Sequence, residues 1–120
     1  IMSRCPYGVR AVEDVFAALD SVAAEQRPKV VVRYILYPGG PGDSLGYRSL
    51  HGPKELEENL AQIVLREVHA EGLPRYLRLR SSSEEAWEVL ATRAGIPLTD
   101  IRAASRLMRS AGKALLRPLQ

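Results

Sequence analysis

One stretch of the sequence, KVVVRYILYP at residues 29–38, constrains the fold more than any other. It is rich in β-branched and aromatic residues and is bounded by prolines, which predicts a strand buried on both faces. Such a strand cannot stand alone, because its backbone donors and acceptors need partners on both edges. We therefore expect residues 1–3 to run parallel to it, and further polypeptide or a second subunit of a homo-oligomer to complete the sheet.

The rest of the chain is typical of amphipathic helices. Apolar periodicity and start and stop residues predict helices over residues 6–26, 53–72, 81–95 and 99–117, with a short helical piece at 74–79. The glycine-rich loop at 39–46 predicts a surface turn, and a short second strand at 45–48 would make it a hairpin. This order predicts a helix-rich α/β domain with an N-terminal part at 1–50 and a helical part at 51–120.

Composition and charge exclude several classes of protein. The longest apolar runs are far short of the roughly 18 residues that span a bilayer, so we expect no transmembrane segment, and the sequence alone does not fix a location. A single cysteine excludes an internal disulfide and a thiolate zinc cluster. The net charge of +3 is too small to indicate a nucleic-acid partner.

The only cysteine, Cys5, lies at the predicted start of the first helix. Backbone donors without partners and the positive end of the helix dipole favour a thiolate there, and Arg4 and Arg10 are expected to add to this effect. The alternative interpretation is a small apolar residue that fills the start of a helix. Cys5 is therefore the first candidate for a reactive residue.

Three residues follow the cysteine in a run that suits a reactive thiol. Pro6 restricts the turn, and the ring of Tyr7 is placed to shelter the sulfur. Gly8 has no side chain and permits a close approach by the backbone of a substrate or cofactor.

Trp87 is expected to have a structural role, as an anchor of the core between helices.

Four runs, MSRCPYGV, SLHGPKELEENLAQ, WEVLATRAGI and GKALL, occur in this order. In them the chain resembles the DsbA-like branch of the thioredoxin superfamily, in which a Cys-Pro-Tyr-x motif opens a helix and a helical subdomain is inserted. The resemblance implies a thioredoxin-like part at 1–50, a helical insertion at 51–120 and a fold incomplete at both ends. It also implies a thiol-disulfide oxidoreductase with the site residues Cys5, Pro6, Tyr7 and Gly8, in an extracytoplasmic (periplasmic) location.

The chain departs from this family in its thiols. Gly8 stands where two-cysteine members have the resolving cysteine, so a monothiol mechanism would need an external thiol such as glutathione as co-substrate, with protein or low-molecular-weight disulfides as partners. A sensor thiol that forms sulfenic acid is a second use. We expect no bound cofactor and no metal, since His51, His69 and Cys5 match no metal-binding spacing. The alternative function is a redox-inactive scaffold or binding subunit in a larger assembly.

The last predicted helix has one strongly basic face. The cations that share it are Arg102, Arg106, Arg109, Lys113 and Arg117. A solvated surface is the plain interpretation of such a face. The sharper one is a docking surface for an acidic protein partner or for anionic lipid headgroups. Nucleic acid is disfavoured, because no aromatic residues alternate with these cations.

Overall fold

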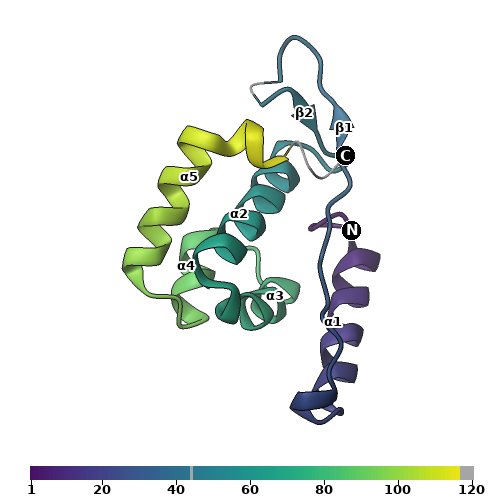
Figure 1. Ribbon diagram of the computed structural model, residues 1–120. Helices are drawn as coiled ribbons and strands as arrows, with labels where there is room; N and C mark the ends of the chain where they lie inside the picture. The colour runs from purple at the N-terminus through teal and green to yellow at the C-terminus, as the bar shows by residue number, and fades with distance from the viewer. Residues whose placement is uncertain (44, 117–120) are drawn as a thin grey trace.

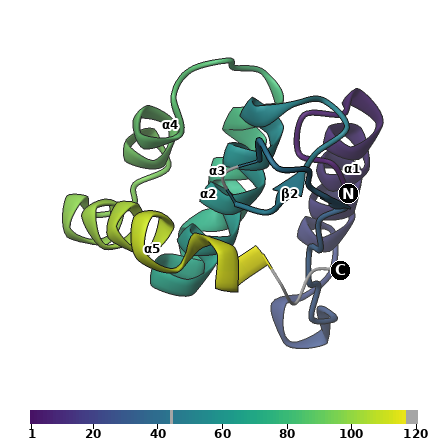
Figure 2. The ribbon, with the colours of Figure 1, turned by 90° about the horizontal axis from the view of Figure 1, so that it is seen from above.

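The computed structural model describes residues 1–43 and 45–116, and its helices lie in three layers (Figure 1; Figure 2). On one side lies α1 (Pro6–Asp20), in the middle α2 (Pro53–His69) and α3 (Leu73–Ser81), and on the far side α4 (Trp87–Arg93) and α5 (Leu98–Leu116). Short 3₁₀ helices follow α1 and α2 at Ala24–Gln26 and Ala70–Gly72. In the described residues, no helix is both long and apolar enough to cross a bilayer.

Two helices differ in extent from the sequence prediction. α1 ends at Asp20, short of the expected residue 26. α4 begins at Trp87, although the sequence predicts a serine cap near residue 81. The serines instead close α3, since Ser81 Oγ donates a hydrogen bond to Arg78 O at 2.6 Å. The side chain that was expected to start one helix therefore ends the preceding one.

The strand that the sequence predicts at residues 29–38 is wrong in its extent. Residues 29–36 are extended but lie outside any sheet, and the strand β1 contains only Tyr37–Pro38. β1 pairs antiparallel with β2 (Tyr47–Arg48), and this pairing confirms the predicted hairpin. The long apolar run therefore folds as an extended segment, which we call the 29–36 segment.

Ile1 lies beside the 29–36 segment, as predicted. Its N donates to Arg33 O at 2.5 Å, and Ile35 N donates to Ile1 O at 2.7 Å, which is the pattern of a parallel pair. Burial on both faces, however, is wrong. Tyr34 is 2% exposed and faces the helices, whereas Ile35 is 47% exposed. Side chains alternate across an extended chain, so one face is buried and the other is open.

The core lies where α2 meets the other helices. α2 contributes Leu60, Ile63, Val64 and Leu65, and α3, α4 and α5 cover them with Tyr76, Leu90, Ile101 and Leu116 among others. Trp87 is buried in this cluster, which confirms its predicted role as a core anchor. α5 approaches α2 closely at Gly112, where a Cβ atom would lie 3.0 Å from a methyl group of Leu60. The core therefore belongs mainly to residues 51–116.

Candidate functional site

Cys5 occupies the N-cap position of α1, as the sequence predicts. Its N–H donates to Met2 O at 3.1 Å and closes a turn, and its carbonyl accepts the first helical hydrogen bond, from Val9 N at 2.9 Å. Pro6 is the first helical residue. Proline suits this position, because an N–H group there would have no hydrogen-bond partner within the helix. The thiol is partly buried and makes no capping hydrogen bond. Cys5 is therefore a partly exposed residue at the start of a helix.

Tyr7 and Gly8 do not act as the sequence predicts. Tyr7 is 87% exposed and points into solvent, so it does not shelter the sulfur. A Cβ atom at Gly8 would lie 2.8 Å from Met2 O and 3.4 Å from Ile1 Cβ. The close approach that Gly8 permits is thus made by the chain's own residues 1 and 2. A side chain at this position would displace the turn that carries Cys5.

The two arginines near Cys5 are both paired with carboxylates. Arg4 NH1 lies 2.6 Å from Glu84 Oε2, and Arg10 Nε lies 3.2 Å from Asp14 Oδ1. Each positive charge is therefore partly neutralised, and the electrostatic support that these arginines give to a Cys5 thiolate is weaker than the sequence suggests.

Two fully buried side chains of α2 hold the turn before Cys5. Arg4 N donates to Glu55 Oε2 at 3.0 Å, and Ser3 N donates to Asn59 Oδ1 at 3.3 Å. Ser3 Oγ also donates to the Glu55 carbonyl at 3.3 Å. Sequence reasoning missed this clamp. The available signal was a glutamate at the third helical position after Gly52, where such a side chain reaches back to the preceding backbone.

Glu55 is ionised because its partners outweigh its burial. Burial alone raises the pKa of its carboxyl, but hydrogen bonds from Ser49, from Arg4 N and from His51 hold the pKa below its usual value. His51 contributes twice, with its backbone N–H and with Nδ1 at 2.8 Å from Glu55 Oε2. These two bonds hold His51 at the entry of α2.

A second buried carboxylate, Glu58, lies one turn further along α2. It accepts hydrogen bonds from Tyr76 and Gln62 at 2.8 Å and pairs with Arg80 NH2 at 2.9 Å. Gln62 in turn accepts from Tyr34 OH at 2.7 Å. Burial raises the pKa of both tyrosines, so each hydroxyl keeps its proton and donates it. This network connects the 29–36 segment to the helical core.

A polar cavity of about 260 Å³ opens beside the Cys5 turn, and we call it the Arg4 cavity. Arg4 comes from the turn, Arg80 from α3 and Trp87 from α4. The remaining lining residues are Lys54, Glu57, Glu58, Glu84, Glu85, Ala86 and Glu88. Arg4, the residue directly before Cys5, therefore lines this cavity.

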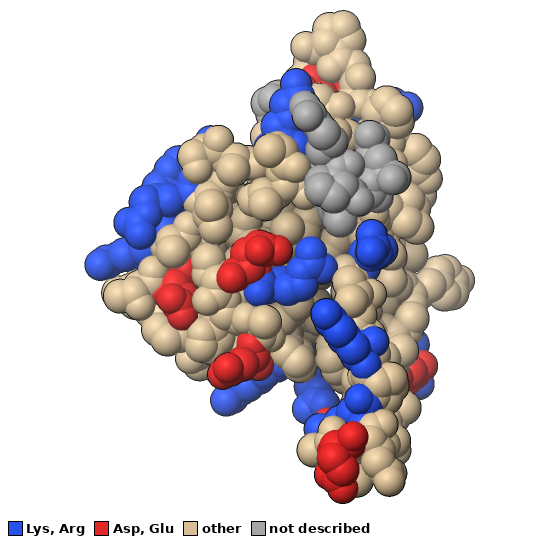
Figure 3. Space-filling view, in the orientation of Figure 1, with Lys and Arg blue, Asp and Glu red and all other residues tan. Residues whose placement is uncertain are grey.

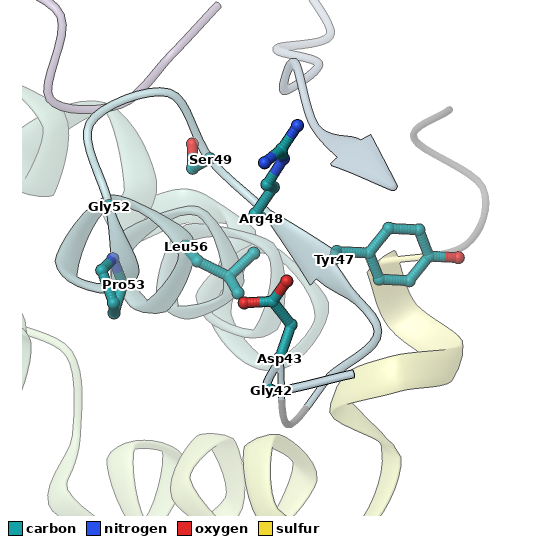
Figure 4. Close-up of a pocket in the computed structure, with 8 residues that line it drawn as sticks. All are labelled: Gly42, Asp43, Tyr47, Arg48, Ser49, Gly52, Pro53 and Leu56. Atoms are coloured by element: carbon teal, nitrogen blue, oxygen red, sulfur yellow. The ribbon is translucent and has the colours of Figure 1, made fainter. Parts of the chain in front are cut away.

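A second cavity of about 160 Å³ lies between the hairpin and the first turn of α2 (Figure 4). Two of its polar side chains already have partners within the chain: Asp43 Oδ2 accepts from Gly40 N, and Ser49 donates to Glu55. Further backbone bonds, such as Gly39 N to Gly46 O at 3.0 Å, close the glycine-rich loop on itself. The loop is the surface turn that the sequence predicts.

The basic face of α5 is exposed, as predicted. Figure 3 shows Lys and Arg side chains gathered over this helix, where the exposed cations are Arg102, Arg106, Arg109 and Lys113. None of these four forms an ion pair with a carboxylate in the described part of the chain. Arg117, which the sequence places on the same face, lies outside the described residues.

The chain was compared with models of known families, with curated proteins and with solved structures, and none of them matches it. The resemblance to the DsbA-like group is therefore one of sequence motifs alone.

Proposed function

We propose that the protein is a thioredoxin-like, DsbA-like domain that performs thiol-disulfide exchange through Cys5 as a single thiol. The observation that carries this proposal is the clamp on the Cys5 turn, in which two fully buried polar side chains of α2, Glu55 and Asn59, hold the backbone just before the thiol. Partial exposure at a helix start suits a reactive thiolate.

The reaction proceeds in two exchanges. The Cys5 thiolate attacks one sulfur of a disulfide R–S–S–R′, the S–S bond breaks, and R′–S⁻ leaves and takes a proton from water. Because the chain has one cysteine, the resulting mixed disulfide must be attacked by an external thiolate. That attack restores the Cys5 thiolate and releases a new disulfide. A low-molecular-weight thiol such as glutathione is the co-substrate that this scheme requires.

Trapping of the mixed disulfide tests the proposal. Incubation with oxidised glutathione should add one glutathione to the chain, measured by intact mass, and reduced glutathione should remove it. Cys5→Ser should show no adduct and no disulfide reduction. Equal reduction of a disulfide-linked peptide by wild type and Cys5→Ser would contradict the proposed mechanism.

A redox-inactive scaffold is the second candidate function, and the exposed basic face of α5 favours it. Four cations without carboxylate partners among the described residues suit an acidic protein partner, because Arg binds carboxylates with two parallel hydrogen bonds. In that case wild type should show no disulfide exchange, and reversal of charge at Arg102 and Arg106 should abolish complex formation. A complex that survives both reversals and high salt would exclude this face as the docking surface.

A further inference from the structure

The backbone edge of the 29–36 segment that faces Ile1 is only partly paired. Ile1 bonds to Arg33 O and to Ile35 N, so the odd-numbered residues of the segment point to this edge. The N–H and C=O of Val31 and the N–H of Arg33 are therefore directed to the same edge. Within residues 1–43 and 45–116, none of these three groups forms a hydrogen bond. Such a row of donors and acceptors is a template for pairing with a further strand.

An apolar trough of about 350 Å³ lies beside this open edge. Val31 and Arg33 line it together with Ala11, Val12, Val15 and Phe16 of α1, which runs alongside the segment in Figure 1. The trough is open to solvent, since Val15 is 42% and Val31 is 51% exposed. Side chains alternate across a strand, so a strand at this edge would place every second side chain on α1. Apolar side chains suit those positions.

The solvent-facing side of the segment carries two cations. Lys29 and Arg33 lie two and four residues from exposed Val31 and Lys29 respectively, and positions two apart share one face of an extended chain. Neither cation forms an ion pair in the described part of the chain. Opposite charges on neighbouring strands stabilise their pairing. A strand with carboxylates on its solvent-facing side therefore fits this edge.

The same two cations disfavour a second copy of the chain as the added strand. An antiparallel two-fold pair centred on Val31 uses both of its open backbone groups. This pair sets Lys29 of each copy opposite Arg33 of the other copy, and like charges directly opposite each other are destabilising. Charge complementarity thus favours an acidic partner.

We propose that the trough between α1 and the 29–36 segment binds an extended acidic segment of another polypeptide, which adds as a strand at the edge formed by Val31 and Arg33. Main-chain hydrogen bonds provide the affinity of such a contact, and alternate side chains provide its specificity. The apolar side chains of the partner lie on α1, and its carboxylates lie beside Lys29 and Arg33. Cys5 is not among the described residues that line the trough, so this surface is separate from the proposed thiol exchange.

N-methylated peptides test the strand addition, because each N-methyl group removes a backbone donor and blocks one edge. The probe is the fluorescein-labelled peptide Val-Glu-Val-Glu-Val-Glu, and its fluorescence anisotropy is followed on titration with the 120-residue chain. Binding should be saturable. N-methylation of all valines and N-methylation of all glutamates block opposite edges of the extended peptide. One of these isomers should bind at least about tenfold more weakly than the other, and the weaker isomer reports the direction of the added strand.

Variants of the chain locate the site. Val15→Glu places a carboxylate on the trough and should weaken binding by about tenfold or more. Val89→Glu, at a similarly exposed valine of α4, should leave binding unchanged. Wild type should prefer the probe to Val-Lys-Val-Lys-Val-Lys, and Arg33→Glu should reduce or reverse this preference.

Three results overturn the proposal: no saturable binding, equal binding of the two N-methylated isomers, and equal weakening by Val15→Glu and Val89→Glu. Sedimentation of the chain without the probe tests the other occupant. A dimer that does not bind the probe would assign the trough to a second copy and would also overturn the proposal. A loss of binding in Val15→Glu alone, with one isomer blocked, supports the site whether or not Cys5 exchanges disulfides.

Discussion

α1 and α2 start alike but end in different environments. Each begins with proline in the first turn, and they contain 15 and 17 residues. Nine residues of α2 are buried, whereas α1 has no buried residue. Figure 1 shows the cause: α2 is packed between layers, and α1 stands at the edge of the molecule beside the 29–36 segment. An amphipathic pattern gives a helix one apolar face. That face is buried only where another element of the fold packs against it.

The buried ion pair of α2 should give the largest effect in a test of this contrast. Glu58→Ala leaves the Arg80 guanidinium buried without its partner, which costs about 3–5 kcal/mol of unfolding free energy. Urea denaturation at neutral pH measures the loss. Glu57→Ala, an exposed neighbour on the same helix, should change stability by less than about 0.5 kcal/mol. Similar losses of stability in both variants would mean that the loss in Glu58→Ala does not come from the buried ion pair with Arg80.

A matched pair of truncations compares the two helices directly. Leu65→Ala in α2 opens a cavity in a fully buried site and should cost about 2–5 kcal/mol. Val15→Ala in α1 removes an exposed side chain and should cost no more than about 0.5 kcal/mol. Thermal unfolding of both variants measures the difference. Equal costs would show that α1 is covered by a surface absent from this structure.

The same contrast explains what the sequence predicts and what it does not. The helices and the Trp87 anchor follow from the periodicity of residues close in the chain. The clamp before Cys5 joins Arg4 to Glu55, about fifty positions apart. The local pattern at the start of α2 indicates that Glu55 reaches back toward the backbone, but it does not indicate that Arg4 is its partner. The run of apolar residues at 29–36 predicts an extended chain, but which of its faces is covered depends on the packing of α2.

The third prediction concerns the clamp, which joins the two regions. Folding lowers the pKa of Glu55. Ionised Glu55 therefore contributes fully to the free energy of unfolding above the usual glutamate pKa of about 4.3, and this contribution is lost as the pH falls through the pKa of Glu55 in the folded protein. Glu55→Gln should cost about 1–3 kcal/mol at pH 7, because partners that donate to a carboxylate lose an acceptor. Its stability should then fall less than that of wild type on acidification, as followed by circular dichroism. An identical acid dependence would remove Glu55 from the linkage.

The smallest effect on stability is expected on the open face of the 29–36 segment. Ile35 is 47% exposed, and its backbone N–H is already bonded to Ile1 O, so Ile35→Lys keeps this bond and removes only an exposed apolar side chain. Stability should change by less than about 0.5 kcal/mol. Self-association should fall, because a charge on an exposed extended segment opposes pairing with another chain.

Analytical ultracentrifugation over a range of concentrations measures this association. Val89→Lys is the control, since Val89 is 43% exposed on α4, on the far side of the molecule from the 29–36 segment. If the open face mediates self-association, Ile35→Lys lowers the average mass and Val89→Lys does not. Equal effects would assign the association to general surface hydrophobicity, and a monomeric wild type would show that the open face has no affinity for a second copy. Either result would mean that contacts with α2 and α3 alone stabilise α1 and the 29–36 segment. The difference between α1 and α2 would then lie in how much of each helix is buried within one chain, and not in contacts with a second copy.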